Sequence, residues 1–216
     1  MRKNIFSVAV CIACVALFCL PAASHAKRGM PDYVIEKSYG DNNTGPALLI
    51  AFATNYGSTY RVAEVIAEVM SAEGYRVDLH FAKNIASGEL DGYDAVILGS
   101  SIYIEKWHAD ALAFLDLHQD ALADIPIAYY CVNGLLGMNF EGKEDLVEEH
   151  YVQPMYELYS SKFVPKDIAA FAGAVDYRIL NFKDWMMLHL MFMPRGNWTD
   201  YAAVVSWAYE VSGKLQ

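Results

Sequence analysis

Cysteine is scarce in this chain, and most of it lies near the beginning. Three of the four cysteines fall within the first 19 residues, which leaves Cys131 as the only cysteine in the long remainder of the sequence. A disulfide framework needs pairs of cysteines, so internal disulfides are excluded for that remainder. Its stability must come from a hydrophobic core. We interpret Cys131 itself as a residue of a strand core and not as a nucleophile.

Positive charge is also in short supply. The 216 residues include 16 lysines and arginines against 26 aspartates and glutamates, which gives a net charge of −10 at pH 7. Surfaces that bind nucleic acids depend on clustered lysine and arginine side chains, because these neutralise phosphates. We therefore expect no nucleic acid partner.

Several well-known site motifs are missing. The chain has no GxxxxGK[ST] loop for a nucleoside triphosphate and no GxGxxG fingerprint for a dinucleotide. Its six histidines show no metal-binding spacing such as HExxH, so we expect no metal site. His108 could transfer protons near neutral pH. We interpret it as a solvent-facing residue, however, and assign no catalytic side chain.

What is present begins with a leader. Arg2 and Lys3 precede an uncharged apolar run over residues 5–20, and small residues lead up to Ala26. This pattern predicts a secretory signal peptide over residues 1–26. The run of 16 residues is shorter than the roughly 20 that cross a bilayer, so a retained anchor is the second alternative. We expect the protein to be exported, in the simplest case to the periplasm. Without residues 1–26 the chain has 14 basic and 26 acidic residues, a net charge of −12.

After the leader, the chain changes from a polar arm to alternating elements. Residues 27–46 are rich in turn formers and predict a linker. Apolar runs predict strands at 47–53, 77–81, 95–99, 125–132 and 168–174, and helical periodicity is found at 59–74, 107–121, 143–160 and 201–212. Such alternation implies parallel strands joined by right-handed crossovers. We therefore predict an α/β fold with an open, doubly wound sheet.

In doubly wound sheets, ligands bind beyond the carboxyl ends of the strands. Three segments fall there, at 54–59, 100–107 and 133–137. The first, TNYGST, leads into a helix whose free N–H groups favour an anion, and its hydroxyl groups and Gly57 suit a phosphate. Because the segment has no lysine, a single terminal phosphate fits better than a triphosphate. Alternatively, Thr54 and Ser58 only cap the helix.

These three segments resemble the flavin loops of flavodoxins. TNYGST is similar to their T-x-T-G-x-T phosphate loop, GSSIY falls where an aromatic residue stacks on the flavin, and CVNGLLG falls where the other flavin-flanking loop emerges. The resemblance implies a flavodoxin-like domain over residues 47–216, a three-layer sandwich whose five-stranded parallel sheet has the order 2-1-3-4-5. It also implies FMN as the cofactor. The FMN-binding residues that it implies are Thr54, Asn55, Tyr56, Gly57, Ser58, Thr59, Ser100, Ser101, Ile102, Tyr103, Asn133, Gly134 and Leu135.

Two aromatic residues near the second segment have alternative interpretations. Tyr103 stacks on the flavin, or it is an ordinary half-buried aromatic residue. Trp107 flanks the same ring, or it packs on a neighbouring loop.

Longer phrases resemble one branch of the superfamily, which contains menaquinone-dependent protoporphyrinogen IX dehydrogenase. They are YDAVILGSSIYIEKWHADALAFL, YYCVNG, FAGAVDYRILNFKDWMM and NWTDYAAVVSWA. The resemblance implies an FMN-dependent oxidoreductase that passes electrons from a reduced organic substrate to a quinone. An exported flavodoxin that carries electrons between protein partners is the alternative, and a cofactor-free binding module is a third interpretation.

An insertion precedes the last predicted helix. The 25 residues between Ala174 and Asp200 are many for a loop, which indicates a functional segment. Its stretch WMMLHLMFM, residues 185–193, is apolar almost all round. It predicts either a buried accessory helix or dimer contact, or a pliable surface that meets a quinone, a porphyrin or the membrane edge. The expected partners are thus a quinone or a redox protein, with peripheral membrane contact through 185–193 as one alternative.

Overall fold

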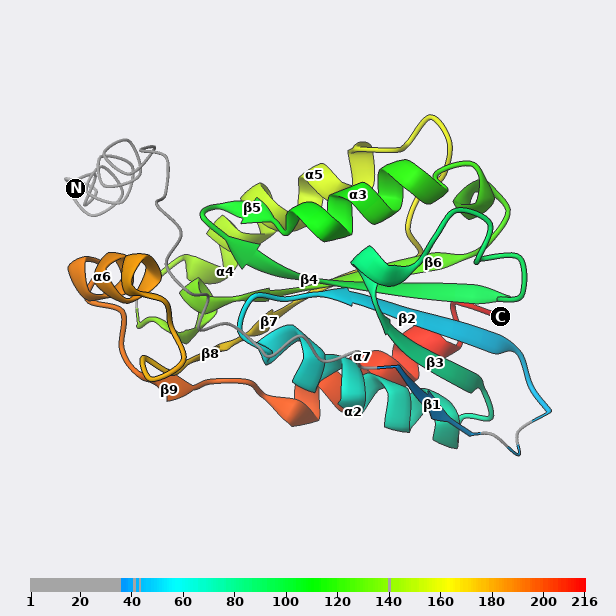
Figure 1. Ribbon diagram of the computed structural model, residues 1–216, viewed down its shortest axis with the longest axis horizontal. Coiled ribbons are helices and arrows are strands. Elements are labelled where there is room, and N and C mark those ends of the chain that lie inside the picture. The colour runs from blue at the N-terminus through cyan, green and yellow to red at the C-terminus, as the bar shows by residue number, and fades with distance from the viewer. Residues whose placement is uncertain (1–35, 41, 43, 140) are drawn as a thin grey trace.

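The computed structural model describes residues 36–40, 42, 44–139 and 141–216, so the predicted signal peptide lies outside the described residues. Helices cover both faces of a central sheet (Figure 1). On one face lie α3 (Ala109–His118), α4 (Lys143–Val147) and α5 (Gln153–Glu157). On the other lie α2 (Ser58–Ala72) and α7 (Tyr201–Ser212). The predicted three-layer α/β class is confirmed.

Five parallel strands form the body of the sheet. They are β2 (Ala47–Ala53), β3 (Arg76–Phe81), β4 (Ala95–Tyr103), β6 (Ile127–Asn133) and β7 (Ile168–Ala172). Their order in the sheet is β3-β2-β4-β6-β7. Every residue of β2 and β6 is buried, as expected for strands that helices cover on both faces.

A short strand extends the sheet beyond the five. Part of the segment that we predicted as a linker forms β1 (Lys37–Tyr39), which pairs antiparallel with β3. Ser38 Oγ also donates a hydrogen bond to Asp78 Oδ1 at 2.6 Å. Without β1, one edge of β3 would present unpaired backbone groups, a situation that proteins avoid.

The second site segment is also more regular than predicted. The strand expected at 95–99 continues to Tyr103, and the chain then turns back as β5 (Lys106–Trp107), antiparallel to β4. Trp107 therefore belongs to a strand, and α3 begins at Ala109 instead of at residue 107. The reason is the pairing of Ile102 with Trp107 and of Tyr103 with Lys106, which extends the ladder of β4 past the sheet.

The helical segments end close to the predicted limits. Gly74 follows α2 with a φ of 97°, the left-handed conformation that glycine adopts at helix ends. The region 143–160 divides into α4, a π-helical turn η4 (Glu148–Val152) and α5. Three 3₁₀ turns complete the helical elements of the body: η1 (Ala82–Asn84), η2 (Ala121–Ala123) and η3 (Gly134–Gly137).

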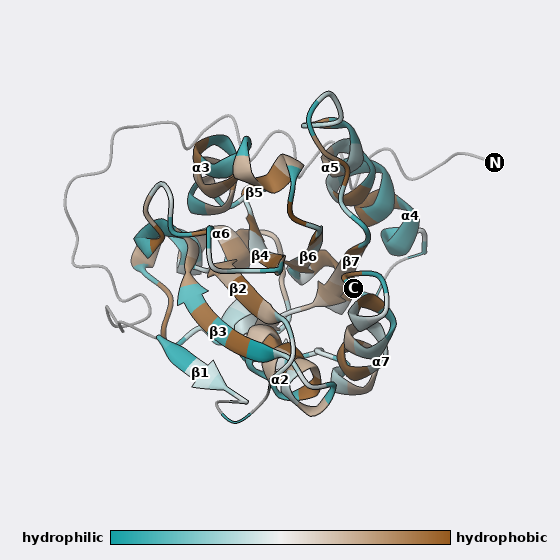
Figure 2. Ribbon diagram, turned by 90° about the vertical axis from the view of Figure 1, so that its right-hand side faces the viewer, coloured by the Kyte–Doolittle hydropathy of each residue, from teal (hydrophilic) through white to brown (hydrophobic). Residues whose placement is uncertain are grey.

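The sheet separates two hydrophobic clusters. One joins the sheet to α2 and α7 through residues such as Phe52, Ile66 and Trp207. The other joins it to α3, η4 and α5 through Leu98, Phe114 and other apolar side chains. Figure 2 shows the hydrophobic strands between the two helix layers. Because truncating one such side chain to alanine costs about 2–5 kcal/mol, this core holds the strand ends in fixed positions.

The insertion lies beyond the carboxyl ends of the strands (Figure 1). It contains β8 (Ala174–Val175), α6 (Phe182–Leu190) and β9 (Gly196–Asn197), with β8 antiparallel to β9. None of the helices in the described part of the chain combines the length and the apolar composition that crossing a bilayer requires.

Candidate functional site

Three predicted segments meet at one edge of the sheet. Strands β2, β4 and β6 are direct neighbours, with Ala53 paired with Ser100 and Ser100 paired with Cys131. The segments that begin at Thr54, Ser100 and Asn133 therefore stand side by side. The third one continues from β6 into the 3₁₀ turn η3.

The first segment forms a tight turn into α2. Gly57 is the residue before the helix, with a φ of 88°, and its N–H donates to Thr54 Oγ1 at 3.0 Å. In the described structure no side chain caps α2 and its first turn holds no acidic residue. Thr54 and Ser58 thus do not cap the helix, contrary to the simpler interpretation. The first-turn N–H groups and the helix dipole are arranged to suit an anion.

Each of the three segments carries a buried polar atom without a protein partner. Among the described residues, these atoms include Thr59 Oγ1, Ser101 Oγ and Asn133 Nδ2. An unsatisfied buried polar group costs about 1–3 kcal/mol, so proteins rarely keep one without a ligand or another reason. Hydroxyl groups, one amide and a free helix N-terminus fit the phosphate and the polar ring atoms of the predicted FMN.

The second segment ends in a strained hairpin turn. Ile104 and Glu105 have φ values of 48° and 59°, in the left-handed region that residues other than glycine seldom adopt, β-branched ones such as isoleucine least of all. Strain of this kind is found mainly where a site demands it. Here it places Tyr103 at the end of β4. Ile102, its predicted neighbour in the site, pairs with Trp107 and packs against the core cluster of α3.

Trp107 packs on the protein and does not flank the site. Its ring is buried, with Nε1 donating to Tyr151 O at 2.9 Å and the ring edge against Tyr129 at 5.8 Å between centroids. Of the two interpretations offered for Trp107, the structure supports packing.

His108 links the first two segments. Our interpretation of it as a solvent-facing residue is wrong. Only 15% of its side chain is exposed. Its backbone N–H donates to Ser100 Oγ at 2.9 Å, and Nδ1 accepts from the N–H of Asp110 at the start of α3. The remaining nitrogen, Nε2, lies 3.3 Å from Asn55 Oδ1. Burial lowers the His108 pKa, while the Asp110 carboxylate raises it and Lys83 lowers it further, so the neutral ring donates through Nε2.

The third segment is shaped by Asn133 and by two glycines. Asn133 Oδ1 accepts from the N–H of Leu135 at 2.8 Å, which fixes the turn. A Cβ on Gly134 would lie 2.9 Å from the Met193 methyl group, and a Cβ on Gly137 would lie 2.4 Å from the Trp198 ring. The insertion therefore contacts this segment closely.

The insertion also reaches the other two segments, through a residue that sequence reasoning missed. Asp184 of α6 is 3% exposed and accepts hydrogen bonds from the hydroxyl groups of Tyr56 and Tyr103, the latter at 2.6 Å. Ser58 Oγ contacts the backbone of Ala174, at the start of the insertion, at 3.4 Å. Burial and the Asp184 carboxylate raise the pKa of both tyrosines.

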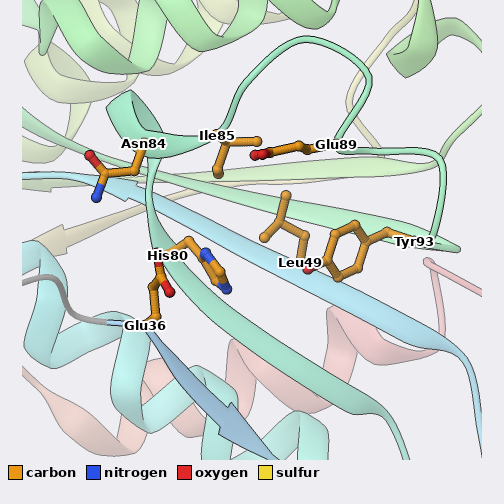
Figure 3. Close-up of a pocket in the computed structure, with 7 residues that line it drawn as sticks. All are labelled: Glu36, Leu49, His80, Asn84, Ile85, Glu89 and Tyr93. Atoms are coloured by element: carbon orange, nitrogen blue, oxygen red, sulfur yellow. The ribbon is translucent and has the colours of Figure 1, made fainter.

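A separate pocket lies on the β3 side of the sheet (Figure 3). Its volume is about 360 Å³, and its lining consists of Glu36, Leu49, His80, Asn84, Ile85, Glu89 and Tyr93. None of these residues belongs to the three segments. Within the described ranges, no group of three or more histidine, cysteine, aspartate or glutamate side chains is placed to hold a metal ion.

Comparison with known proteins agrees with this geometry. A family model described as a flavodoxin domain matches residues 49–201. The chain is 27% identical over 173 residues to protoporphyrinogen IX dehydrogenase [quinone] of Escherichia coli (strain K12), covering 76% of this chain and 93% of that protein. It is 28% identical over 156 residues to the protein of the same name from Leishmania major, covering 72% and 66%. Among solved structures, oxidised flavodoxin 1 from Bacillus cereus has a TM-score of 0.51 at 16% identity, covering 79% and 99%.

Proposed function

Because this chain belongs to the flavodoxin domain family and FMN is its cofactor, we propose that it is an FMN-dependent oxidoreductase acting on a reduced organic substrate. The substrate loses two electrons and two protons, and a quinone gains them. Two similar proteins that carry the name protoporphyrinogen IX dehydrogenase [quinone] support this class of reaction.

The observation that carries the proposal is the way the insertion meets the flavin loops. It contacts all three segments, and it also exposes large apolar side chains, with Phe182 69%, Leu190 51% and Phe192 89% exposed. A protein that only carries electrons between partners needs no such segment over its cofactor. An apolar surface beside the flavin loops suits an organic reductant or a quinone.

The roles of the chain's own residues follow from their positions. Bound FMN supplies the redox chemistry. The N-terminus of α2 with Gly57, Ser58 and Thr59 would hold the phosphate. Ser101 and Asn133 would offer polar groups to the ring, and Tyr103 would border it at the end of β4. His108 donates to Asn55 and keeps the first two segments in register.

A reoxidation experiment tests the function. The domain from residue 27 onward is loaded with FMN, reduced, and mixed with a menaquinone analogue in a stopped-flow instrument. We expect reoxidation faster than that of ordinary flavodoxins under the same conditions. Reoxidation at their rate would favour the electron-carrier alternative, and a preparation that binds no FMN would refute both redox functions.

We propose that the exposed side of α6 receives the apolar quinone at a membrane edge. The insertion, residues 175–199, has three basic and two acidic residues in a chain of net charge −10, so an anionic lipid surface repels it less than it repels the chain as a whole. Substituting Trp185 and Phe192 with serine should raise KM for a long-chain quinone and leave KM for a water-soluble quinone unchanged. Leu117→Ser on α3, 52% exposed, is the control.

Export is also part of the proposal, since the leader has the features of a signal peptide. Cell fractionation with an antibody against the folded domain tests it. A periplasmic protein that starts at Lys27 is the expected result, and a cytoplasmic protein that retains Met1 would overturn it.

A further inference from the structure

Helix α6 docks on the protein in an unusual way. An apolar helix normally buries apolar side chains, yet the buried residue of α6 is Asp184, at 3% exposure. Its neighbour Trp185 is 39% exposed, and Phe182 is 69% exposed. The interpretation of residues 185–193 as a buried accessory helix is therefore wrong for its large aromatic residues. The one fully buried side chain of the helix is thus a carboxylate.

The carboxylate is fully engaged by neutral donors. Oδ1 accepts from the Tyr103 hydroxyl at 2.6 Å, while Oδ2 accepts from the Tyr56 hydroxyl and from Asn181 Nδ2, the latter at 2.9 Å. Asn181 Nδ2 also donates to the Tyr56 oxygen at 2.9 Å, and Asn181 Oδ1 accepts from the Asp184 N–H at the start of α6. A buried charge is tolerated only with such complete hydrogen bonding.

The two tyrosines come from different parts of the site. Tyr56 lies in the middle of TNYGST, and Tyr103 lies at the end of β4 beside the strained turn. Their hydroxyl groups meet at one carboxylate that is 128 and 81 residues away in the chain. Asp184 thus sets the separation between the segment that faces the phosphate and the segment that faces the ring.

We propose that Asp184 is a positioning residue of the FMN site, which couples FMN binding to the docking of α6. The inference rests on the FMN site proposed above. Asp184 fixes Tyr56 and Tyr103, and these fix the two segments that FMN must bridge. In return, FMN that orders the two segments favours the arrangement in which α6 is docked.

The reciprocal coupling gives two measurable consequences. Asp184→Ala leaves both tyrosine hydroxyl groups and Asn181 without their acceptor, so FMN affinity should fall by about tenfold or more, as expected for lost hydrogen bonds to a charged group. The amide hydrogens of α6 should also exchange faster in the FMN-free protein, because the helix is less firmly docked. Asp184→Asn keeps the volume but loses one acceptor oxygen, and should have a smaller effect on both measurements.

The experiment combines FMN titration by fluorescence quenching with hydrogen exchange of residues 182–190, in the presence and absence of FMN. The variants are Asp184→Ala, Asp184→Asn, Tyr56→Phe and Tyr103→Phe. Lys183→Ala, at an exposed position next to Asp184, is the control and should match the parent protein. The absorption spectrum of FMN at saturation is recorded as well, since a general loss of stability would not change its shape.

The outcomes separate this inference from the function. Coupling is supported if FMN slows exchange in α6 of the parent protein, and if Asp184→Ala weakens FMN binding, speeds exchange and changes the bound spectrum. It is overturned if the parent protein binds FMN and Asp184→Ala binds it equally well with the same spectrum. A parent protein that does not bind FMN would overturn the proposed function and this inference together.

Discussion

Thr59 illustrates how a single residue can serve a ligand and not the fold. Its side chain is completely buried, yet Oγ1 has no hydrogen-bond partner among the described residues. In the folded protein alone, this hydroxyl group has lost its water and gained no replacement, which costs free energy. A residue of this kind is expected where a ligand completes the hydrogen bonding.

Thr59→Ala should therefore have different effects on stability and on binding. The free energy of unfolding without FMN should stay within about 0.5 kcal/mol or rise, while FMN binding should weaken by about 1–3 kcal/mol. Urea denaturation and FMN titration measure the two quantities. Thr199→Ala is the contrasting control, because Thr199 Oγ1 donates to Ala172 O at 2.9 Å and its loss should lower stability. Unchanged FMN affinity in Thr59→Ala would place the phosphate elsewhere.

Gly99 gives a second prediction for a single residue. A Cβ at this position would lie 2.1 Å from the ring of Tyr130, which is itself completely buried and donates to Thr59 O at 3.1 Å. Gly99→Ala must displace that ring and should lower the free energy of unfolding by about 1–3 kcal/mol. Because the Tyr130 hydroxyl group donates to the backbone oxygen of Thr59, a residue of the predicted FMN site, FMN affinity should fall as well. Gly92→Ala, which meets nothing within 4 Å, should change neither quantity.

Among the elements, the β4–β5 hairpin shows the clearest conflict between sequence and backbone. A two-residue hairpin turn favours Asn-Gly, since both residues adopt positive φ. The chain has Ile104 and Glu105 there. The double substitution Ile104→Asn with Glu105→Gly should raise the free energy of unfolding by about 1–3 kcal/mol, the strain typical of such positions.

Urea denaturation of the FMN-free protein checks this prediction for the hairpin. Glu105→Gln keeps the strained backbone and should leave stability unchanged, so it is the matched control. If the double substitution gives no gain, the turn is not strained. Weaker FMN binding together with higher stability would indicate that the strained turn serves the site.

How much of the structure could be predicted from the sequence also differs from one element to another. Strands β2, β4 and β6 are continuous apolar runs, and their carboxyl ends locate the site in any doubly wound sheet. Strands β1 and β5 are three and two residues long and leave no periodicity in the sequence. The docking of α6 could not be predicted, because it depends on hydrogen bonds from Asp184 to Tyr56 and Tyr103, which lie 128 and 81 residues earlier in the chain. The only local signal was Asn181 three residues before Asp184, a pattern of helix starts.

At the scale of the whole molecule, we expect the response to acid to depend on two histidines, the half-buried His108 and the buried His118. His108 lies between the first two site segments, and His118 lies at the end of α3, 3% exposed, with its ring against Phe114. Burial lowers the pKa of both side chains below the ordinary value of 6.5. Both therefore stay neutral in the folded protein at a pH where they are protonated in the unfolded chain.

This difference predicts the direction of the pH dependence. Between the folded and the unfolded pKa values, the unfolded chain binds more protons, so stability rises with pH. The contribution of the two histidines is complete above about pH 6.5 and is lost as the pH falls below that value. Carboxylates titrate mostly below about pH 5, so the interval from about pH 7.5 to 5.5 isolates the histidines.

Urea denaturation at these two pH values should show lower stability at the acidic one. His108→Asn retains a side-chain acceptor for the Asp110 N–H, and His118→Gln retains a donor that can reach Ile85 O. In the double variant, stability should change less between the two pH values than in the parent protein. FMN affinity should also be lower at the acidic pH. Protonation of His108 removes the acceptor at Nδ1 and so disturbs the start of α3 beside Ser100. An equal loss of stability in both proteins would assign the acid sensitivity to other groups.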